Sequence, residues 1–234
     1  MITIIRKSIK ILLLIGLSCN VSSCLMLFFT GPTQFNDTVP VSQHSKQPPA
    51  LKNQPRVYTM RGFMDVFSTG MNDLTKKINL QLGIKSTALS YLEEKKLSNY
   101  LIHEYQAGRK RGPIVLIGHS FGADEQITVA NRLNKAHVPV ALLITLDNTK
   151  TQIIPPNVHT FYNINSGRSM LSMIVPWGTP LVAADKHTNM ITVNLSKHRA
   201  FSMVNHFNID KLPAVQNYLI DIIQKTVRDC KKGR

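Results

Sequence analysis

The apolar residues along the chain follow two kinds of pattern. Residues 113–117 form a short continuous apolar run, which is typical of a strand buried on both faces of a sheet. Residues 70–82 carry apolar side chains three and four positions apart and are followed by Gly83, as in an amphipathic helix that stops at a glycine. The predicted strands are residues 57–60, 84–91, 113–117, 138–146, 158–164 and 190–195, and the predicted helices are residues 70–82, 93–107, 121–136 and 212–227.

This alternation of strands and helices predicts the fold class. Strands separated by helical segments favour an α/β fold, in which a mostly parallel central sheet is covered by helices on both faces. The chain has 234 residues, of which 43% are hydrophobic and 18% charged, so it can bury an ordinary core and is not a disordered chain. We expect one folded domain over residues 56–234, with no internal repeat.

The N-terminal segment has the features of an export signal. Basic residues precede an apolar stretch at residues 11–17, and residues 21–24 read Val-Ser-Ser-Cys, which looks like a bacterial lipobox. In that interpretation residues 1–23 are a signal peptide and Cys24 carries the lipid. The alternative is an uncleaved membrane anchor or a plain signal peptide, because residues 25–29 extend the apolar stretch. Each alternative places the folded domain outside the cytoplasm, and we expect it in the cell envelope, in the periplasm of a bacterium.

Residues 24–55 are predicted to be a flexible tether. They are rich in Pro, Gln, Ser, Asn and Thr and show no apolar periodicity. Two of the three cysteines, Cys19 and Cys24, lie in or next to the leader, which excludes a disulfide framework and a zinc site built from cysteines.

The chain is strongly basic, with a formal net charge of +15. The basic residues occur in scattered pairs without interleaved aromatic residues, and an exported protein meets little nucleic acid, so no nucleic-acid partner is expected. The charge either belongs to a solvated surface or attracts the domain to anionic lipids and polymers of the envelope.

The clearest chemical motif is Gly118-His119-Ser120-Phe121-Gly122. It stands between a predicted buried strand and a predicted helix, which is the context of a nucleophile elbow. The glycines two positions before and after the serine face each other across a tight turn, where side chains would clash. The turn presents the Ser120 hydroxyl, and the first N–H groups of the helix point to where an oxyanion would form.

With this motif in this context, the chain resembles the α/β-hydrolase superfamily, in particular its compact lipases, esterases and thioesterases. The resemblance covers about residues 57–223 and implies a nucleophile, an acid and a histidine in that chain order. For the acid, Asp147 follows directly after a predicted strand, at the edge of a parallel sheet where ligands bind. Asp185 remains the alternative acid, because many members of the superfamily carry the acid one strand later.

For the base, the resemblance points to His206, which follows the last predicted strand and precedes the closing helix. His198 is a rival, but its neighbours are Lys197 and Arg199, as on a solvated surface. His119 lies inside the elbow and cannot reach its own neighbour as a base.

The resemblance also implies two backbone donors for the oxyanion hole. One is the N–H of Phe121, the residue after the nucleophile. The other would come from Phe63, at the third position of a turn that often reads His-Gly-X in the superfamily. In this chain Arg61 replaces the usual histidine.

No cofactor or metal is expected. His103-Glu104 is followed by Ala107 where a zinc protease would have its second histidine, and neither a dinucleotide-binding nor a P-loop motif occurs. The segment before His206 leaves room for little or no lid, although residues 166–184 could form a small flap. Apolar residues there, Trp177 among them, could line an acyl pocket or pack in the core.

These observations predict an exported, membrane-tethered serine hydrolase that acts on carboxylic esters or thioesters of small molecules or lipids. Ser120 would be acylated, His206 would accept its proton and Asp147 would orient the imidazole. A non-catalytic envelope lipoprotein that uses the same scaffold for binding is the alternative, because a fold does not determine a function. A transferase that uses the same acyl-enzyme is a third, weaker interpretation.

Overall fold

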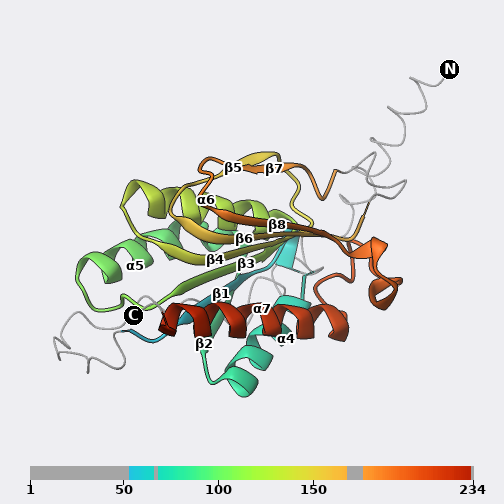
Figure 1. The fold of residues 1–234 in the computed structure, drawn as a ribbon, viewed down its shortest axis with the longest axis horizontal. Coiled ribbons are helices and arrows are strands. Elements are labelled where there is room, and N and C mark those ends of the chain that lie inside the picture. The colour runs from blue at the N-terminus through green and yellow to red at the C-terminus, as the bar shows by residue number, and fades with distance from the viewer. Residues whose placement is uncertain (1–52, 66–67, 168–175, 233–234) are drawn as a thin grey trace, which may run out of the picture. The chain divides into compact units, whose positions relative to one another are not determined.

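The computed structural model describes residues 53–65, 68–167 and 176–232. The predicted leader, Cys24 and almost all of the predicted tether lie outside these residues. The centre of the domain is a six-stranded sheet in the order β2-β1-β3-β4-β6-β8, and every neighbouring pair in it is parallel (Figure 1). Its strands are β1 (Arg56–Met60), β2 (Lys85–Leu89), β3 (Ile114–His119), β4 (Val140–Leu146), β6 (Val158–Asn165) and β8 (Asn189–Asn194).

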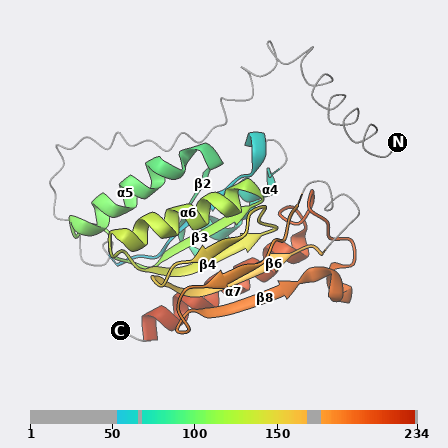
Figure 2. The same ribbon diagram turned by 90° about the horizontal axis from the view of Figure 1, so that it is seen from above.

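Helices cover both faces of this sheet (Figures 1 and 2). One face carries α4 (Gly70–Lys77), which continues into the π-helical turn η2 (Ile78–Leu82), together with α7 (Pro213–Lys232). The other face carries α5 (Glu94–Gln106) and α6 (Phe121–Lys135). Short 3₁₀ helices connect these elements: η1 (Phe63–Asp65), η3 (Tyr91–Glu93), η5 (Leu195–Lys197) and η6 (Arg199–Phe201).

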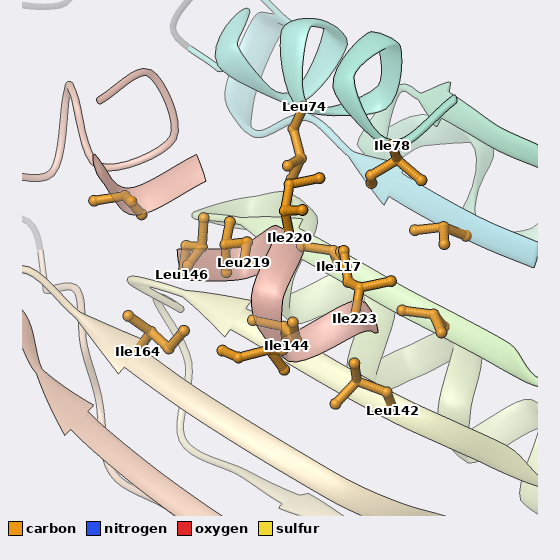
Figure 3. Packing of buried hydrophobic residues seen from close by; sticks show 14 of the residues in the cluster. Leu74, Ile78, Ile117, Leu142, Ile144, Leu146, Ile164, Leu219, Ile220 and Ile223 are labelled. Carbon is orange, nitrogen blue, oxygen red and sulfur yellow. The ribbon is translucent and has the colours of Figure 1, made fainter. Parts of the chain in front are cut away.

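The sheet separates two apolar cores, and the alternation of side chains along β3 shows how. Val115 and Ile117 point to the core under α4 and α7, whereas Leu116 points to the core under α5 and α6. Figure 3 shows the first core, in which Leu74 of α4 and Leu219 of α7 lie over the strands. Burying each such side chain contributes roughly 1.5–3 kcal/mol, so packing on both faces keeps the strand ends in place.

The α/β architecture predicted from the sequence is therefore confirmed, and a strand or helix is present at each predicted position. The closing helix expected at residues 212–227 is longer and reaches Lys232. The strand expected at residues 84–91 is shorter, because Ser90 leaves the sheet to start η3 with a capping box to Glu93. The strand expected at 113–117 is longer and reaches His119.

The sequence analysis missed a second, two-stranded parallel sheet formed by β5 (Gln152–Ile154) and β7 (Leu181–Ala183). Each strand has three residues, which is too few for a recognisable period. Part of the suggested flap at residues 166–184 is thus a strand, while residues 168–175 lie outside the described part of the chain. Within the described ranges, no helix has the length and hydropathy that a membrane span requires.

Candidate active site

Ser120 lies in a strained turn between β3 and α6. Its backbone has φ 56° and ψ −125°, outside the regions that a serine normally occupies. A Cβ on Gly118 would lie 2.2 Å from the carbonyl oxygen of Gly122, and one on Gly122 would lie 2.4 Å from that of Met60. The two glycines therefore allow a turn that no larger residue would permit, as expected for a nucleophile elbow.

The acid and the base predicted from the sequence meet at the same edge of the sheet. The Nδ1 atom of His206 lies 3.2 Å from Oδ2 of Asp147, although the two residues are 59 positions apart. Asp147 directly follows β4, whereas His206 lies in a turn between η6 and α7. Asp147 is completely buried and the His206 side chain is 11% exposed. Because an ionised carboxylate only accepts, Nδ1 carries the proton and Nε2 of a neutral His206 is left as the basic atom.

Ser166 completes the binding of the Asp147 carboxylate. Its backbone N–H donates to Oδ1 at 2.8 Å, and its hydroxyl donates to Oδ2 at 2.6 Å. The sequence analysis did not name Ser166, although it follows the end of β6, next to β4 in the sheet, as Asp147 follows β4. Its place after a strand at the same edge is a signal that could have pointed to it, but the strand predicted at 158–164 ends one residue before β6 does.

Aromatic rings hold the imidazole of His206. The indole of Trp177 stacks on it with 4.6 Å between ring centroids and an interplanar angle of 19°. The Phe207 ring meets it edge-on at 5.5 Å, and the His119 ring lies 5.0 Å away. Trp177, which was considered for an acyl pocket or the core, thus contacts the candidate base directly. The other apolar residues of that segment, at positions 170–175, lie outside the described residues.

The two rival residues lie elsewhere. Asp185 is in the turn that precedes β8, at the opposite edge of the parallel sheet, where its Oδ1 accepts the backbone N–H of His187 at 2.9 Å. His198 is exposed between η5 and η6. The structure therefore pairs Asp147 with His206 and leaves both rivals outside this pair.

The loop after β1 passes directly beside Ser120. A Cβ on Gly62 would lie 3.0 Å from Cβ of Ser120 and 2.9 Å from the carbonyl oxygen of His119. The next residue, Phe63, contacts Phe121 with 5.5 Å between ring centroids. Both residues predicted to supply oxyanion donors thus flank Ser120, and the Phe121 N–H belongs to the first turn of α6, where backbone donors lack helical acceptors.

Arg61, which stands where the superfamily often has histidine, braces this loop. Its side chain is buried and donates from Nε to Asp65 Oδ1 at 3.1 Å and from a terminal nitrogen to Asn72 Oδ1 at 2.8 Å. Asp65 has a positive φ of 59°, a conformation that this ion pair helps to hold. The departure from the superfamily pattern therefore joins the loop to α4.

A buried carboxylate on α6 fixes the turn that follows Asp147. Asp124 accepts the backbone N–H groups of Thr149 and Lys150, each at 3.1 Å, and also the Thr149 hydroxyl. Burial raises the pKa of Asp124, and these hydrogen bonds oppose that rise. Asn148 in the same turn donates to the carbonyl oxygen of Thr179 at 3.1 Å, which ties the turn to the segment carrying Trp177.

Comparison with known proteins adds little beyond the fold. No protein-family model matches the chain, and no curated protein matches it. A cutinase-like protein from a Cryptococcus species is 14% identical, with a TM-score of 0.44 over 74% of this chain and 95% of that one. A protein from Xanthomonas campestris that is named only as a candidate hydrolase of the α/β superfamily is 14% identical (TM-score 0.41; 73% and 98% covered). The RedJ thioesterase from Streptomyces coelicolor is 10% identical (TM-score 0.41; 75% and 94% covered).

The chain's own topology decides the fold class: a parallel sheet with helices on both faces and a strained serine turn between β3 and α6. The scaffold is α/β-hydrolase-like. In this scaffold the carboxyl ends of the parallel strands form the edge where ligands bind, and Ser120, Asp147 and the loop after β1 all lie there. Among the described residues, no three His, Cys, Asp or Glu side chains are grouped so that they could hold a metal ion.

Proposed function

We propose that this protein is a serine hydrolase that cleaves carboxylic ester or thioester bonds through an acyl-enzyme on Ser120. The observation that carries the proposal is the hydrogen-bonded pair of Asp147 and His206 at the edge of the sheet where the elbow presents Ser120. An acid that orients a histidine beside a strained serine is the arrangement that activates a hydroxyl for attack.

The proposed reaction has two halves. His206 Nε2 takes the proton of the Ser120 hydroxyl while Oγ forms a bond to the acyl carbon. The tetrahedral intermediate collapses, the bond to the alcohol or thiol breaks, and that leaving group takes the proton from His206. A water molecule then gives its proton to His206 and attacks the acyl carbon. The acid is released as Ser120 recovers its proton.

Three features of the site support these steps. Ser166 and His206 surround the Asp147 carboxylate with donors, which orient it to stabilise the imidazolium that forms. The loop at Gly62 and Phe63 and the start of α6 at Phe121 lie close to Ser120, and their backbone N–H groups are the donors proposed for the developing oxyanion.

We propose further that the domain is exported and held at a membrane of the cell envelope, through a lipid on Cys24 or an uncleaved anchor. The leader and tether described from the sequence support this. Growth with an alkyne-tagged fatty acid should label the wild-type protein and not Cys24→Ser. If both chains stay membrane-bound and unlabelled, the anchor replaces the lipid.

Hydrolysis of chromogenic esters and acyl thioesters of graded chain length tests the enzymatic proposal. The full-length protein should release product, and Ser120→Ala should be inactive with the same stability. Thr128→Ala, on an outer position of α6, is the matched control and should keep wild-type activity. Equal, background-level turnover by the wild type and Ser120→Ala would instead favour the non-catalytic envelope lipoprotein.

A further inference from the structure

His119 has a place in the site that the proposed reaction does not use. Val115 and Ile117 of β3 point to the core under α4 and α7, and His119 is the next residue in that row. Its side chain is 1% exposed. A polar ring at the end of a buried apolar row needs hydrogen-bond partners, because an unsatisfied buried polar group costs about 1–3 kcal/mol.

Both ring nitrogens of His119 have a partner. Nε2 lies 2.9 Å from the backbone carbonyl oxygen of His206, and Nδ1 lies 2.8 Å from Oγ of Ser68. A carbonyl oxygen can only accept, so Nε2 must carry the proton and donate it.

The protonation state of Nδ1 follows from the charge of the ring. Burial, aided by the neighbouring His206, lowers the pKa of His119 to about 3, so the ring is neutral near neutral pH. With the proton on Nε2, Nδ1 is bare and accepts the Ser68 hydroxyl. The contacts thus fix the tautomer and exclude His119 as a second base, because neither nitrogen is available for substrate.

The acceptor of this hydrogen bond is the backbone of the candidate base itself. His206 lies in a turn between η6 and α7, outside the sheet and the helices. Immediately around His206 the other hydrogen bonds are local, such as those from the Phe207 and Ile209 N–H groups to Asn205. The His119 bond joins residues 87 positions apart and links the turn to the end of β3, one residue before the nucleophile.

We infer that His119 is a positioning residue for His206, whose neutral ring ties the backbone of the base to the strand that carries Ser120. This inference rests on the proposed serine hydrolase function. The bond holds the turn at the end of β3, so that the imidazole can pair with Asp147 while its backbone is joined to the residue before Ser120. Ser68 orients the His119 ring from behind, as outer-shell partners orient a metal-binding histidine.

Two substitutions of His119 distinguish the effect of losing the hydrogen-bond donor at Nε2 from the effect of losing the ring. The amide nitrogen of glutamine reaches the position of Nε2, so His119→Gln keeps a donor for the His206 carbonyl. The amide of asparagine reaches only the position of Nδ1, so His119→Asn keeps the Ser68 contact and loses that donor. We expect His119→Asn to lower kcat about 10- to 100-fold with KM within about twofold, and His119→Gln to restore most of kcat.

Two further variants complete the set. Ser68→Ala loosens the ring without altering the elbow, and we expect kcat to fall roughly three- to tenfold. It also keeps the inference testable if His119→Asn does not fold. His137→Asn, at an exposed residue with φ 56° after α6, is the matched His-to-Asn control and should keep wild-type kcat.

A second readout does not depend on activity. In protein labelled with ¹⁵N-histidine, His119 should show the shifts of a neutral Nε2–H tautomer at neutral pH, because its pKa is lowered to about 3. The Nδ1–H resonance of His206, bonded to Asp147, should be sharp in the wild type and His119→Gln and broadened in His119→Asn. If that pattern holds in a protein without hydrolase activity, the proposed function fails and the positioning role stands.

Two results would overturn the inference. One is wild-type kcat in a folded His119→Asn, or in Ser68→Ala where His119→Asn does not fold. The other is an equal loss of kcat in folded His119→Asn and His119→Gln, which would show that the donated hydrogen bond is not what matters.

Discussion

The candidate nucleophile and acid, Ser120 and Asp147, are held in a different way from the candidate base, His206. The backbone N–H of Ser120 donates to the Leu146 carbonyl at 2.9 Å, and that of Asp147 donates to the Ile164 carbonyl at 3.0 Å. Both residues therefore continue the ladders of the parallel sheet. His206 instead lies in a turn held by side chains, through His119 at its carbonyl and Trp177 against its ring.

This difference indicates how each half of the site should respond to substitution. Ladder hydrogen bonds and two packed cores fix the positions of residues 120 and 147, so only backbone changes should displace them. A turn held by a few side-chain contacts should lose its alignment when one contact is lost, while the fold persists. Displacement of reacting groups by about 1 Å can lower a rate about 100-fold, so both halves matter for activity.

The largest effect is expected at the acid. Asp147→Asn should lower kcat by about 10⁴-fold, because the amide cannot stabilise the imidazolium and favours the wrong tautomer of His206. Asp185→Asn should keep the wild-type rate, since Asp185 lies at the opposite edge of the sheet. Steady-state hydrolysis of one ester by both variants tests the assignment. Loss of activity in Asp185→Asn alone would reverse it.

Substitutions at the glycines of the elbow should lower stability by displacing the backbone of the turn. Gly118→Ala should cost roughly 3 kcal/mol or more of unfolding free energy, because its Cβ would lie 2.2 Å from the Gly122 carbonyl oxygen. Gly83→Ala is the matched control. Gly83 has a φ of 61° with no atom within 4 Å of the added Cβ, so only conformational strain of about 1 kcal/mol is expected. Urea unfolding of both variants measures the difference, and equal losses would contradict the packed elbow.

On the side of the base, Trp177→Ala should lower kcat roughly tenfold while the fold is retained, because the stacked face of the His206 imidazole becomes open. Trp177→Phe keeps a ring against the imidazole and should recover most of the rate. Thermal unfolding would show whether stability or alignment was lost. An Ala variant with the wild-type kcat would show that the stack does not align the base.

The turn that carries His206 also contains a buried acid, which should give the smallest effect. Asp210 is fully buried, and burial raises its pKa from 3.8 to about 6, against the opposing effects of Lys211 and nearby backbone N–H groups. At neutral pH the folded protein thus buries a charged carboxylate, which lowers its free energy of unfolding. Asp210→Asn should raise the free energy of unfolding by roughly 1 kcal/mol near pH 7.

The pH dependence of that gain has a definite sign. The folded protein binds the Asp210 proton more tightly than the unfolded chain does. The contribution of this group to the free energy of unfolding is therefore complete below pH 3.8 and is lost as the pH rises through about 6. Urea unfolding of Asp210→Asn and the wild type should therefore differ more near pH 7 than near pH 4. The contribution of His119 to the free energy of unfolding depends on pH in the opposite direction. Because the pKa of His119 is lowered to about 3, this contribution is complete above pH 6.5 and is lost as the pH falls below that value. A difference independent of pH would contradict the raised pKa of Asp210.

The sequence predicted the half of the site that depends on the sheet. The apolar run at 113–117 and the glycines around Ser120 carry local signals, and Asp147 stands out as an acid directly after a buried strand. His206 required the resemblance as well, because nothing in its own turn marks it as a base.

The contacts that hold the base could not be predicted in the same way. Ser68 meets His119 across 51 positions, and Trp177 reaches His206 from the segment before β7. Such pairs depend on how loops fold back over the sheet, and no period in the sequence records them. The short strands β5 and β7 were missed because three residues are too few for a period.

The central claim is that His206, held by Asp147, activates Ser120. We would treat the full-length protein with a fluorophosphonate, which forms a covalent bond only with an activated serine, and locate the adduct by mass spectrometry. The account predicts one adduct on Ser120 in the wild type, and little or none in a folded His206→Ala. A folded wild-type protein that stays unlabelled, or labelling of Ser120 at the same rate in His206→Ala, would contradict it.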